Sequence, residues 1–300
     1  MTPNASKRAV QRPRGQGKLR AGALASLALA LKKQWRRYRK RLKRCQNNFS
    51  ETAVHDSRVE TRRLLSLLEL LSDFLPPARL KKIRRALKEH LDTFDELRDA
   101  QVQLPAVNQL QPAFPAARPF AVWLRERETH FTRKTRRRIK TVESRRLAKS
   151  LAACREKLAA QAKACSETAA NARLLGSANL AFRHTCWLRA RINPRDTATI
   201  HRTRVAFKRF RYMVEALAAH LPGANRRVLK AMHDYQALMG EIQDAEVLFQ
   251  TLEQFGAERE TELKSFRRLR QELLRRRQAR IRAYLKASGR ALKFWPLPGA

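Results

Sequence analysis

The sequence predicts an all-α protein built of two pseudo-symmetric antiparallel helical bundles. Apolar residues recur every three or four positions, as at Leu24, Leu27 and Leu31, and this is the spacing of one helix face. The 300 residues include only 9 Gly and 12 Pro, so most of the chain lacks residues that break helices. A stretch around His55 recurs around His201, which indicates two halves with the same plan. No segment alternates apolar and polar residues between turn residues, so we expect no strands.

Helices are expected along nearly the whole chain. Ser50 and Asp196 are suitable N-caps for the second and seventh helices, and Pro76-Pro77 and Pro222-Gly223 end those helices. The expected helices cover residues 23–46, 51–74, 78–103, 118–146, 146–173, 178–192, 196–220, 224–254 and 257–288.

The two ends of the chain are expected to be tails. Residues 1–21 are basic and have no apolar pattern that would fold, so we expect a disordered tail. The apolar stripe of the first helix continues through Cys45, which favours a helix over a signal peptide. Its apolar run is too short to span a bilayer. We expect one domain at 22–290, with repeat halves at about 22–146 and 147–290, and a short C-terminal tail at 291–300.

The charge of the chain indicates its partner. There are 66 Lys and Arg against 26 Asp and Glu, a formal net charge of +40. A surface this positive indicates a polyanion, which is a nucleic acid, an anionic membrane or polyphosphate. Arginine outnumbers lysine, and a planar guanidinium matches phosphate oxygens in pairs.

The cysteines indicate a reducing compartment. No two of them make a CxxC pair, and the chain is not a short disulfide scaffold. We therefore expect free thiols in a cytoplasmic protein, at Cys45, Cys154, Cys165 and Cys186.

The repeated stretch places cations on one helix face. Val54-His55-Asp56-Ser57-Arg58-Val59-Glu60-Thr61-Arg62-Arg63 aligns with Ile200-His201-Arg202-Thr203-Arg204-Val205-Ala206-Phe207-Lys208-Arg209. Positions i, i+3 and i+7 share a face, so His55, Arg58 and Arg62 form one stripe and His201, Arg204 and Lys208 form its twin. Arg211 extends the second stripe, whereas the matching position of the first half is Leu65. We expect the first half to be one cation short.

The next helix of each half carries a second stripe. Its members are Lys81, Arg85 and Lys88 in the first half and Arg226, Lys230 and His233 in the second. Like charges on one face destabilise an isolated helix by about 0.2–0.5 kcal/mol per pair, so matched stripes indicate an anion that both halves share. The alternative, a merely solvated face, is the better interpretation for any single arginine.

Catalysis and metal binding are poorly supported at His55 and His201. No nucleophile or orienting acid repeats beside both histidines, and neither has the spacing of a metal ligand. We therefore expect no catalytic residue, no metal site and no cofactor. The neighbouring cations should hold each histidine neutral, with one N–H left to donate to a phosphate oxygen.

This paired pattern resembles the CHAD family, the conserved histidine α-helical domain. Arg98-Asp99 and Met239-Gly240-x-x-Gln243-Asp244 are similar to the LGxxRD and LGxxND elements of that family. Asp95 stands in place of the family glycine, Gln243 in place of the usual Asn and Leu65 in place of a common Arg. The resemblance covers about residues 23–290.

The resemblance implies two four-helix-type bundles around a basic central groove that binds inorganic polyphosphate. It also implies a location at polyphosphate granules, where some members of the family gather. Such a groove needs only fixed cations, because counterion release drives the binding of a polyanion. The residues expected to bind polyphosphate are His55, Arg58, Arg62, Arg63, Lys81, Arg85, Lys88, His201, Arg204, Lys208, Arg209, Arg211, Arg226, Lys230 and His233.

Two other functions stay open from the sequence. A basic protein that binds nucleic acid non-specifically would carry the same charge, although aromatic residues for base stacking are sparse, at 7%. A polyphosphate or triphosphate hydrolase would need a carboxylate cluster for Mg²⁺. The candidate carboxylates are interpreted instead as orienting partners of basic residues; they are Glu69, Asp99, Glu215 and Asp244.

Overall fold

The computed structural model describes residues 22–259 and 263–296, which contain helices and no strand. The predicted all-α class is therefore confirmed for this part of the chain, whereas the pseudo-symmetry of the two halves stays a prediction. The α-helices are α1 (Ala23–Asn47), α2 (Glu51–Leu70), α3 (Pro77–Asp92), α4 (Asp95–Asn108), α5 (Ala117–Lys140), α6 (Arg145–Ala164), α7 (Glu167–Ala190), α8 (Thr197–Leu217), α9 (Arg226–Arg259) and α10 (Leu263–Ala287). Two 3₁₀ helices follow α2 and α10, at η1 (Ser72–Phe74) and η2 (Ser288–Phe294).

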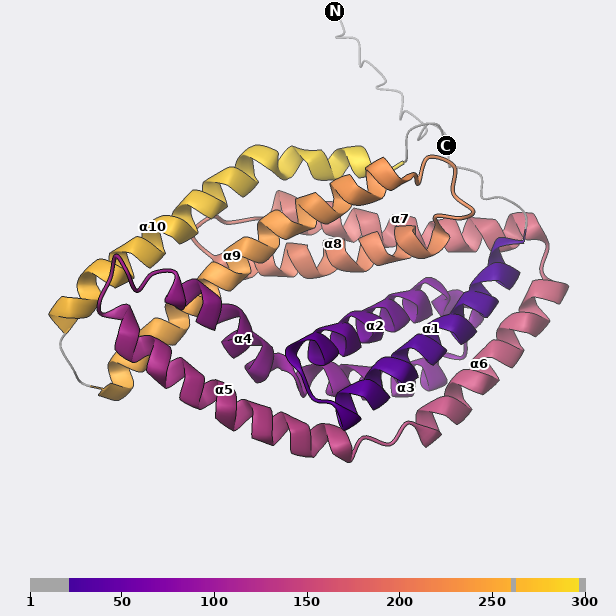
Figure 1. The fold of residues 1–300 in the computed structure, drawn as a ribbon. Helices are drawn as coiled ribbons and strands as arrows, with labels where there is room; N and C mark the ends of the chain where they lie inside the picture. The colour runs from indigo at the N-terminus through magenta and orange to yellow at the C-terminus, as the bar shows by residue number, and fades with distance from the viewer. Residues whose placement is uncertain (1–21, 260–262, 297–300) are drawn as a thin grey trace, which may run out of the picture.

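Helices from both sequence halves share each hydrophobic core. The main core joins α1–α3 to α6–α8 and includes Leu31, Leu68 and Phe210. A second core lies where α4 and α5 meet α9 and α10, around Phe120 and Phe255. Figure 1 shows these four helices together at the end of the molecule where α9 ends and α10 begins. The two halves are thus interlocked, and α2 of the first half packs against α8 of the second.

The helix predicted at 78–103 is two helices. The chain breaks between α3 and α4 at Thr93 and Phe94, where Phe94 is buried in the main core. Packing of an aromatic ring is a tertiary effect that helix periodicity does not reveal. The break starts α4 at Asp95, which places acidic side chains at the favourable N-terminal end of a helix.

The predicted break near residues 174–177 is also wrong. Gly176 lies inside α7, with nothing within 4 Å of where its Cβ would be. The break comes earlier, at Cys165, and the side chain of Ser166 accepts a hydrogen bond from Ala169 N as the N-cap of α7. Ser166 followed by Glu167 is typical of the first residues of a helix. The Gly-Ser pair at 176–177 is the stronger turn pattern, so the sequence predicts the break there.

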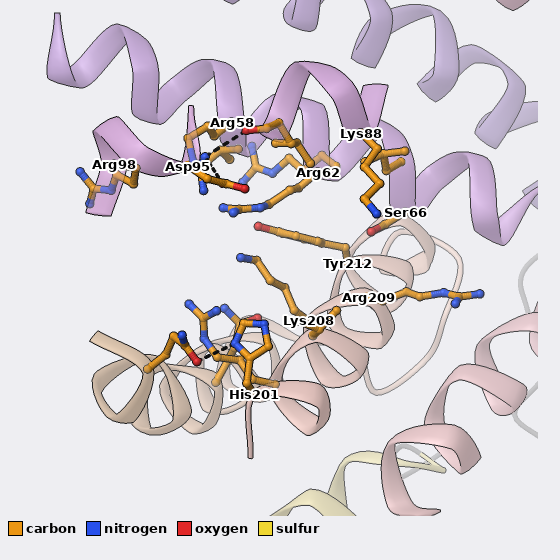
Figure 2. A pocket seen from close by; sticks show the side chains of 18 of the residues that line it. Arg58, Arg62, Ser66, Lys88, Asp95, Arg98, His201, Lys208, Arg209 and Tyr212 are labelled. Carbon is orange, nitrogen blue, oxygen red and sulfur yellow. Dashed lines mark hydrogen bonds and ion pairs between the residues drawn. The ribbon is translucent and has the colours of Figure 1, made fainter. Parts of the chain in front are cut away.

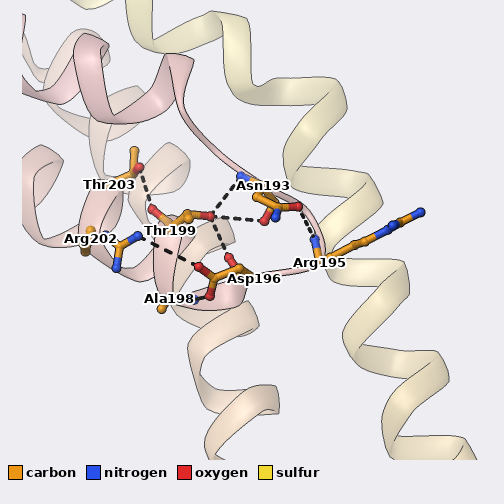
Figure 3. A network of polar contacts seen from close by, with 7 residues as sticks. All are labelled: Asn193, Arg195, Asp196, Ala198, Thr199, Arg202 and Thr203. Atoms are coloured by element: carbon orange, nitrogen blue, oxygen red, sulfur yellow. Dashed lines mark hydrogen bonds and ion pairs between the residues drawn. The ribbon is translucent and has the colours of Figure 1, made fainter.

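The start of α8 is held by a network of polar contacts (Figure 3). Asp196 Oδ1 accepts from Ala198 N at 3.0 Å, which confirms the predicted cap. Thr199 Oγ1 donates to Asp196 O at 2.6 Å and accepts from Asn193 N at 3.1 Å. These bonds fix the helix end immediately before His201. At the start of α2, Ser50 Oγ accepts from Ala53 N as predicted.

The ends of the chain differ from the expected tails. Ala291 and Phe294 are buried against the main core within η2, so residues 291–294 belong to the folded domain. The predicted N-terminal tail at 1–21 lies outside the described residues. No helix among those described is long and apolar enough to cross a membrane. All four cysteines are free.

Candidate anion-binding site

A cavity of about 1310 Å³ lies between α2 and α8, with further walls from α3, α4 and α9. Figure 2 shows cationic side chains entering it from opposite sides, Arg58 and Arg62 from α2 and Lys208 from α8. Most of the predicted site residues line this one cavity. They are His55, Arg58, Arg62, Arg63, Lys81, Arg85, Lys88, His201, Arg204, Lys208, Arg209 and His233.

Two arginines of α2 form one wall. Arg58 is only 7% exposed, and its Nη1 donates to Asp95 Oδ1 at 2.7 Å and to Leu91 O at 3.3 Å. Arg62 forms no ion pair with any carboxylate in the described part of the chain. Burial, and then the neighbouring Arg58, lower the pKa of Arg62 to about 10. The guanidinium stays charged at neutral pH but lacks a counter-ion.

Lys208 faces this wall from α8. Figure 2 shows its ammonium pointing toward Arg62 and toward the hydroxyl of Tyr212. Burial, followed by the charges of Arg62 and Arg204, lowers the pKa of Lys208 to about 6. A lysine in such a field is mostly uncharged at neutral pH until a negative charge arrives.

Arg204 is held against α9. A Cβ added at Gly240 would lie 3.6 Å from both Arg204 Nε and Arg204 Nη2, so the guanidinium lies where a larger side chain would stand. Arg204 Nε is buried and makes no hydrogen bond. Burial lowers the pKa of Arg204, while nearby Asp244 raises it.

The two histidines differ in their contacts. His201 Nδ1 lies 2.6 Å from Gln243 Oε1, an acceptor, so Nδ1 carries the proton. In neutral His201 the remaining Nε2 has no proton to donate, so the expected hydrogen bond to phosphate requires a protonated ring. Burial lowers the pKa of His201, and burial followed by Arg98 lowers the pKa of His55.

The carboxylates have unequal roles. Glu69 pairs with Arg84 at 2.8 Å and also with Arg209, so it orients basic residues as expected. Asp99 and Asp244 line the cavity but form no ion pair with a described residue. Burial, and then neighbouring Asp95, raise the pKa of Asp99 to about 6, and burial also raises the pKa of Asp244.

Comparison with known proteins identifies the family. The family model described as CHAD domain matches residues 29–253. The chain belongs to the CHAD domain family. No curated protein sequence matches it.

Two solved structures are similar to this CHAD domain in fold. One is described as the crystal structure of the CHAD domain from the plant Ricinus communis, with a TM-score of 0.66 and 20% identity. That alignment covers 91% of this chain and 98% of the plant chain. The other is PptA from Streptomyces chartreusis, with a TM-score of 0.63 and 17% identity over 92% of this chain and 99% of that chain.

Three predicted site residues lie away from the cavity of the CHAD domain. Arg211 is buried, donates from Nε to Gln236 Oε1 at 2.9 Å and pairs with Glu215. Around the helix Arg211 is rotated by only about 20° from Arg204, which lines the cavity, so its contacts with Gln236 and Glu215 hold it away. Lys230 is exposed and pairs with Asp234 at 2.6 Å, and Arg226 is exposed at the start of α9.

Several lining residues were not among the predicted site residues. Arg84 and Arg98 add cations, and Ser66, Tyr212 and Gln236 add polar groups. Arg98 stands in the RD element of the resemblance, so that motif was a usable signal. Val205 is 53% exposed and lines the cavity, as does Val59. The helix face that lines the cavity therefore includes Val59 of α2 and Val205 of α8 beside the cationic stripes.

Proposed function

We propose that this CHAD domain binds inorganic polyphosphate in the cavity between α2 and α8 and performs no chemistry on it. The observation that carries the proposal is the meeting of Arg62, Arg204 and Lys208 in one cavity, where no carboxylate forms an ion pair with them among the described residues. Such a site gains free energy when phosphate oxygens replace the missing counter-ions. The family resemblance implies the same ligand.

The walls of the cavity favour a polymer of bare phosphates over a nucleic acid. Tyr212 is the aromatic lining residue apart from the histidines, and it is only 8% exposed. Base recognition by stacking needs open aromatic faces, and no such platform lines this cavity. Polyphosphate has no bases, so a surface of cations can follow its whole backbone.

The residues of the cavity also favour binding over hydrolysis. In the described part of the chain, no three His, Cys, Asp or Glu side chains are grouped so that they would hold a metal ion. Glu69 is engaged by Arg84 and Arg209, and Asp95 by Arg58. A protein of this kind would serve at polyphosphate granules as a binding module in the cytoplasm.

A competition assay tests the proposal. Purified full-length protein is bound to labelled long-chain polyphosphate at fixed salt, and unlabelled polyphosphate, duplex DNA and RNA are added as competitors. We expect polyphosphate to displace the label at the lowest phosphate concentration. Equal or stronger displacement by duplex DNA or RNA would instead support a nucleic-acid-binding protein.

A further inference from the structure

Three side chains from α2 and α8 converge in the middle of the cavity. Figure 2 shows the guanidinium of Arg62, the ammonium of Lys208 and the hydroxyl of Tyr212 directed into the same space. Tyr212 is held by its neighbour Arg211, whose guanidinium lies 4.4 Å from the centre of the Tyr212 ring. The hydroxyl forms no hydrogen bond with a described residue. All three polar ends are thus available to one ligand group.

Lys208 is surrounded by groups of mostly one sign. Arg58 and Arg62 face it from α2, and His201, Arg204 and Arg211 share its helix. No acid of the cavity forms an ion pair with Lys208 among the described residues: Asp95 pairs with Arg58 and Glu69 with Arg84 and Arg209, while Asp99 and Asp244 form no ion pair there. The remaining charged or titratable lining groups are His55, Arg63 and Glu69 on α2, Lys81, Arg84, Arg85 and Lys88 on α3, Arg98 and Asp99 on α4, Arg209 on α8, and His233 on α9.

This environment makes the charge of Lys208 depend on the ligand. With the cavity empty, burial and the guanidinium groups together hold its pKa near 6, so Nζ is mostly neutral at pH 7.5. A phosphate oxygen beside Nζ adds a negative charge at short range and favours the ammonium form. The group would then regain a pKa closer to that of an ordinary lysine.

We propose that Arg62, Lys208 and Tyr212 form a central subsite for one phosphoryl group, and that filling this subsite transfers a proton from solvent to Lys208. The inference rests on the proposed function, because it names how the same cavity takes its ligand. The proton adds to the lone pair of Lys208 Nζ, and no bond of the polyphosphate breaks. Tyr212 donates its O–H to a phosphate oxygen, and Arg62 supplies a charge that does not titrate at neutral pH.

Calorimetry measures the transferred proton directly. Long-chain polyphosphate is titrated into the full-length protein at pH 7.5 in several buffers that differ in ionisation enthalpy, none of them phosphate. Long chains are used so that the ionisation of terminal phosphates is negligible. The slope of observed enthalpy against buffer ionisation enthalpy is expected to show that Lys208 takes up about one proton per filled site. Between the free and bound pKa values, the affinity should fall about tenfold for each unit of rising pH.

Variants assign the proton to Lys208. Lys208→Arg keeps a permanent charge, so it should bind at pH 7.5 with about one proton fewer taken up and with a flatter pH dependence. Lys208→Met should also take up one proton fewer and should bind more weakly. Circular dichroism would verify that each variant is folded. Lys230→Arg, on the exposed face of α9, is the matched control and should leave proton uptake unchanged.

The outcomes separate this inference from the proposed function. Tight binding of polyphosphate without proton uptake would overturn the inference and leave the proposed function standing. Equal uptake in the wild type and in a folded, binding Lys208→Arg variant would also overturn it. Tyr212→Phe should weaken binding several-fold with proton uptake retained, and an unchanged affinity would remove Tyr212 from the subsite. If the protein bound no polyphosphate at all, both proposals would fail together.

Discussion

Arg62 of α2 and Lys208 of α8 face each other across the cavity, and neither pairs with a carboxylate of the described residues. Burial, and then Arg58, lower the pKa of Arg62, while burial, and then Arg62, lower the pKa of Lys208. The main core on which α2 and α8 pack fixes their separation. The fold therefore maintains an unfavourable arrangement of charge that an anion relieves.

Replacing the cations of α8 should weaken binding. In the double variant Arg204→Gln and Lys208→Gln, we expect the affinity for long polyphosphate to fall by about tenfold or more, because charge-assisted hydrogen bonds are removed. The slope of log affinity against log salt should flatten by about one unit for each phosphate that the variant no longer neutralises. Gln is a good helix former and the variant removes repulsion between buried cations, so the midpoint of thermal unfolding should not fall.

The matched variant of α2 is expected to lose at least as much affinity. The sequence predicts weaker anion binding by the first half, because Leu65 occupies the repeat position that matches Arg211. Arg211, however, does not line the cavity. Arg58→Gln with Arg62→Gln also leaves Asp95 without its partner, which adds repulsion. Arg36→Gln with Arg37→Gln, at two exposed positions of α1, is the control. An equal loss of affinity in the control would indicate diffuse charge instead of a site.

The sequence predicts the stripes because a helix repeats every 3.6 residues, whatever lies around it. His55, Arg58 and Arg62 follow that rule and meet His201, Arg204 and Lys208, although nothing in the sequence specifies how α2 approaches α8. Features that depend on tertiary contacts were not predicted.

Two examples show this dependence. The break between α3 and α4 lies at Phe94, whose ring is buried in the main core, and Arg211 lies away from the cavity because Gln236 and Glu215 bind it. The lowered pKa of Lys208 depends on helices far apart in the sequence, so it too requires the folded structure.

We expect no hydrolysis of polyphosphate or ATP by the purified protein with Mg²⁺ or Mn²⁺. The carboxylates that line the cavity are engaged by arginines or have raised pKa values, and neither property suits a metal ligand. Release of inorganic phosphate is the measurement. Turnover that vanishes in Asp99→Asn or Asp244→Asn would show the protein to be an enzyme.

Removing the charge of Asp99 should strengthen binding near neutral pH. Its carboxylate is ionised above its raised pKa of about 6, and there it repels phosphate. A folded-state pKa above the ordinary value also means that ionisation opposes folding as pH rises. Asp99→Asn should therefore raise both the affinity and the free energy of unfolding at pH 7.5, and the gain in unfolding free energy should shrink toward pH 5. Urea titrations at both pH values, with affinities measured in parallel, test this. A variant less stable than wild type at pH 7.5 would contradict it.

Gly240 allows stability and binding to be separated at one position. It lies within α9, where Ala is favoured over Gly by up to about 1 kcal/mol, and a Cβ there would meet Arg204 at 3.6 Å, an ordinary contact distance. Gly240→Ala should therefore stabilise the protein and leave polyphosphate affinity nearly unchanged. Gly240→Leu extends into the volume that the Arg204 guanidinium occupies, so it should displace that group and lower the affinity. The control is Gly176 of α7, where an added Cβ meets nothing within 4 Å. Gly176→Leu should leave the affinity as in wild type. If Gly240→Leu bound polyphosphate as tightly as Gly176→Leu does, the position of Arg204 against α9 would be irrelevant to the site.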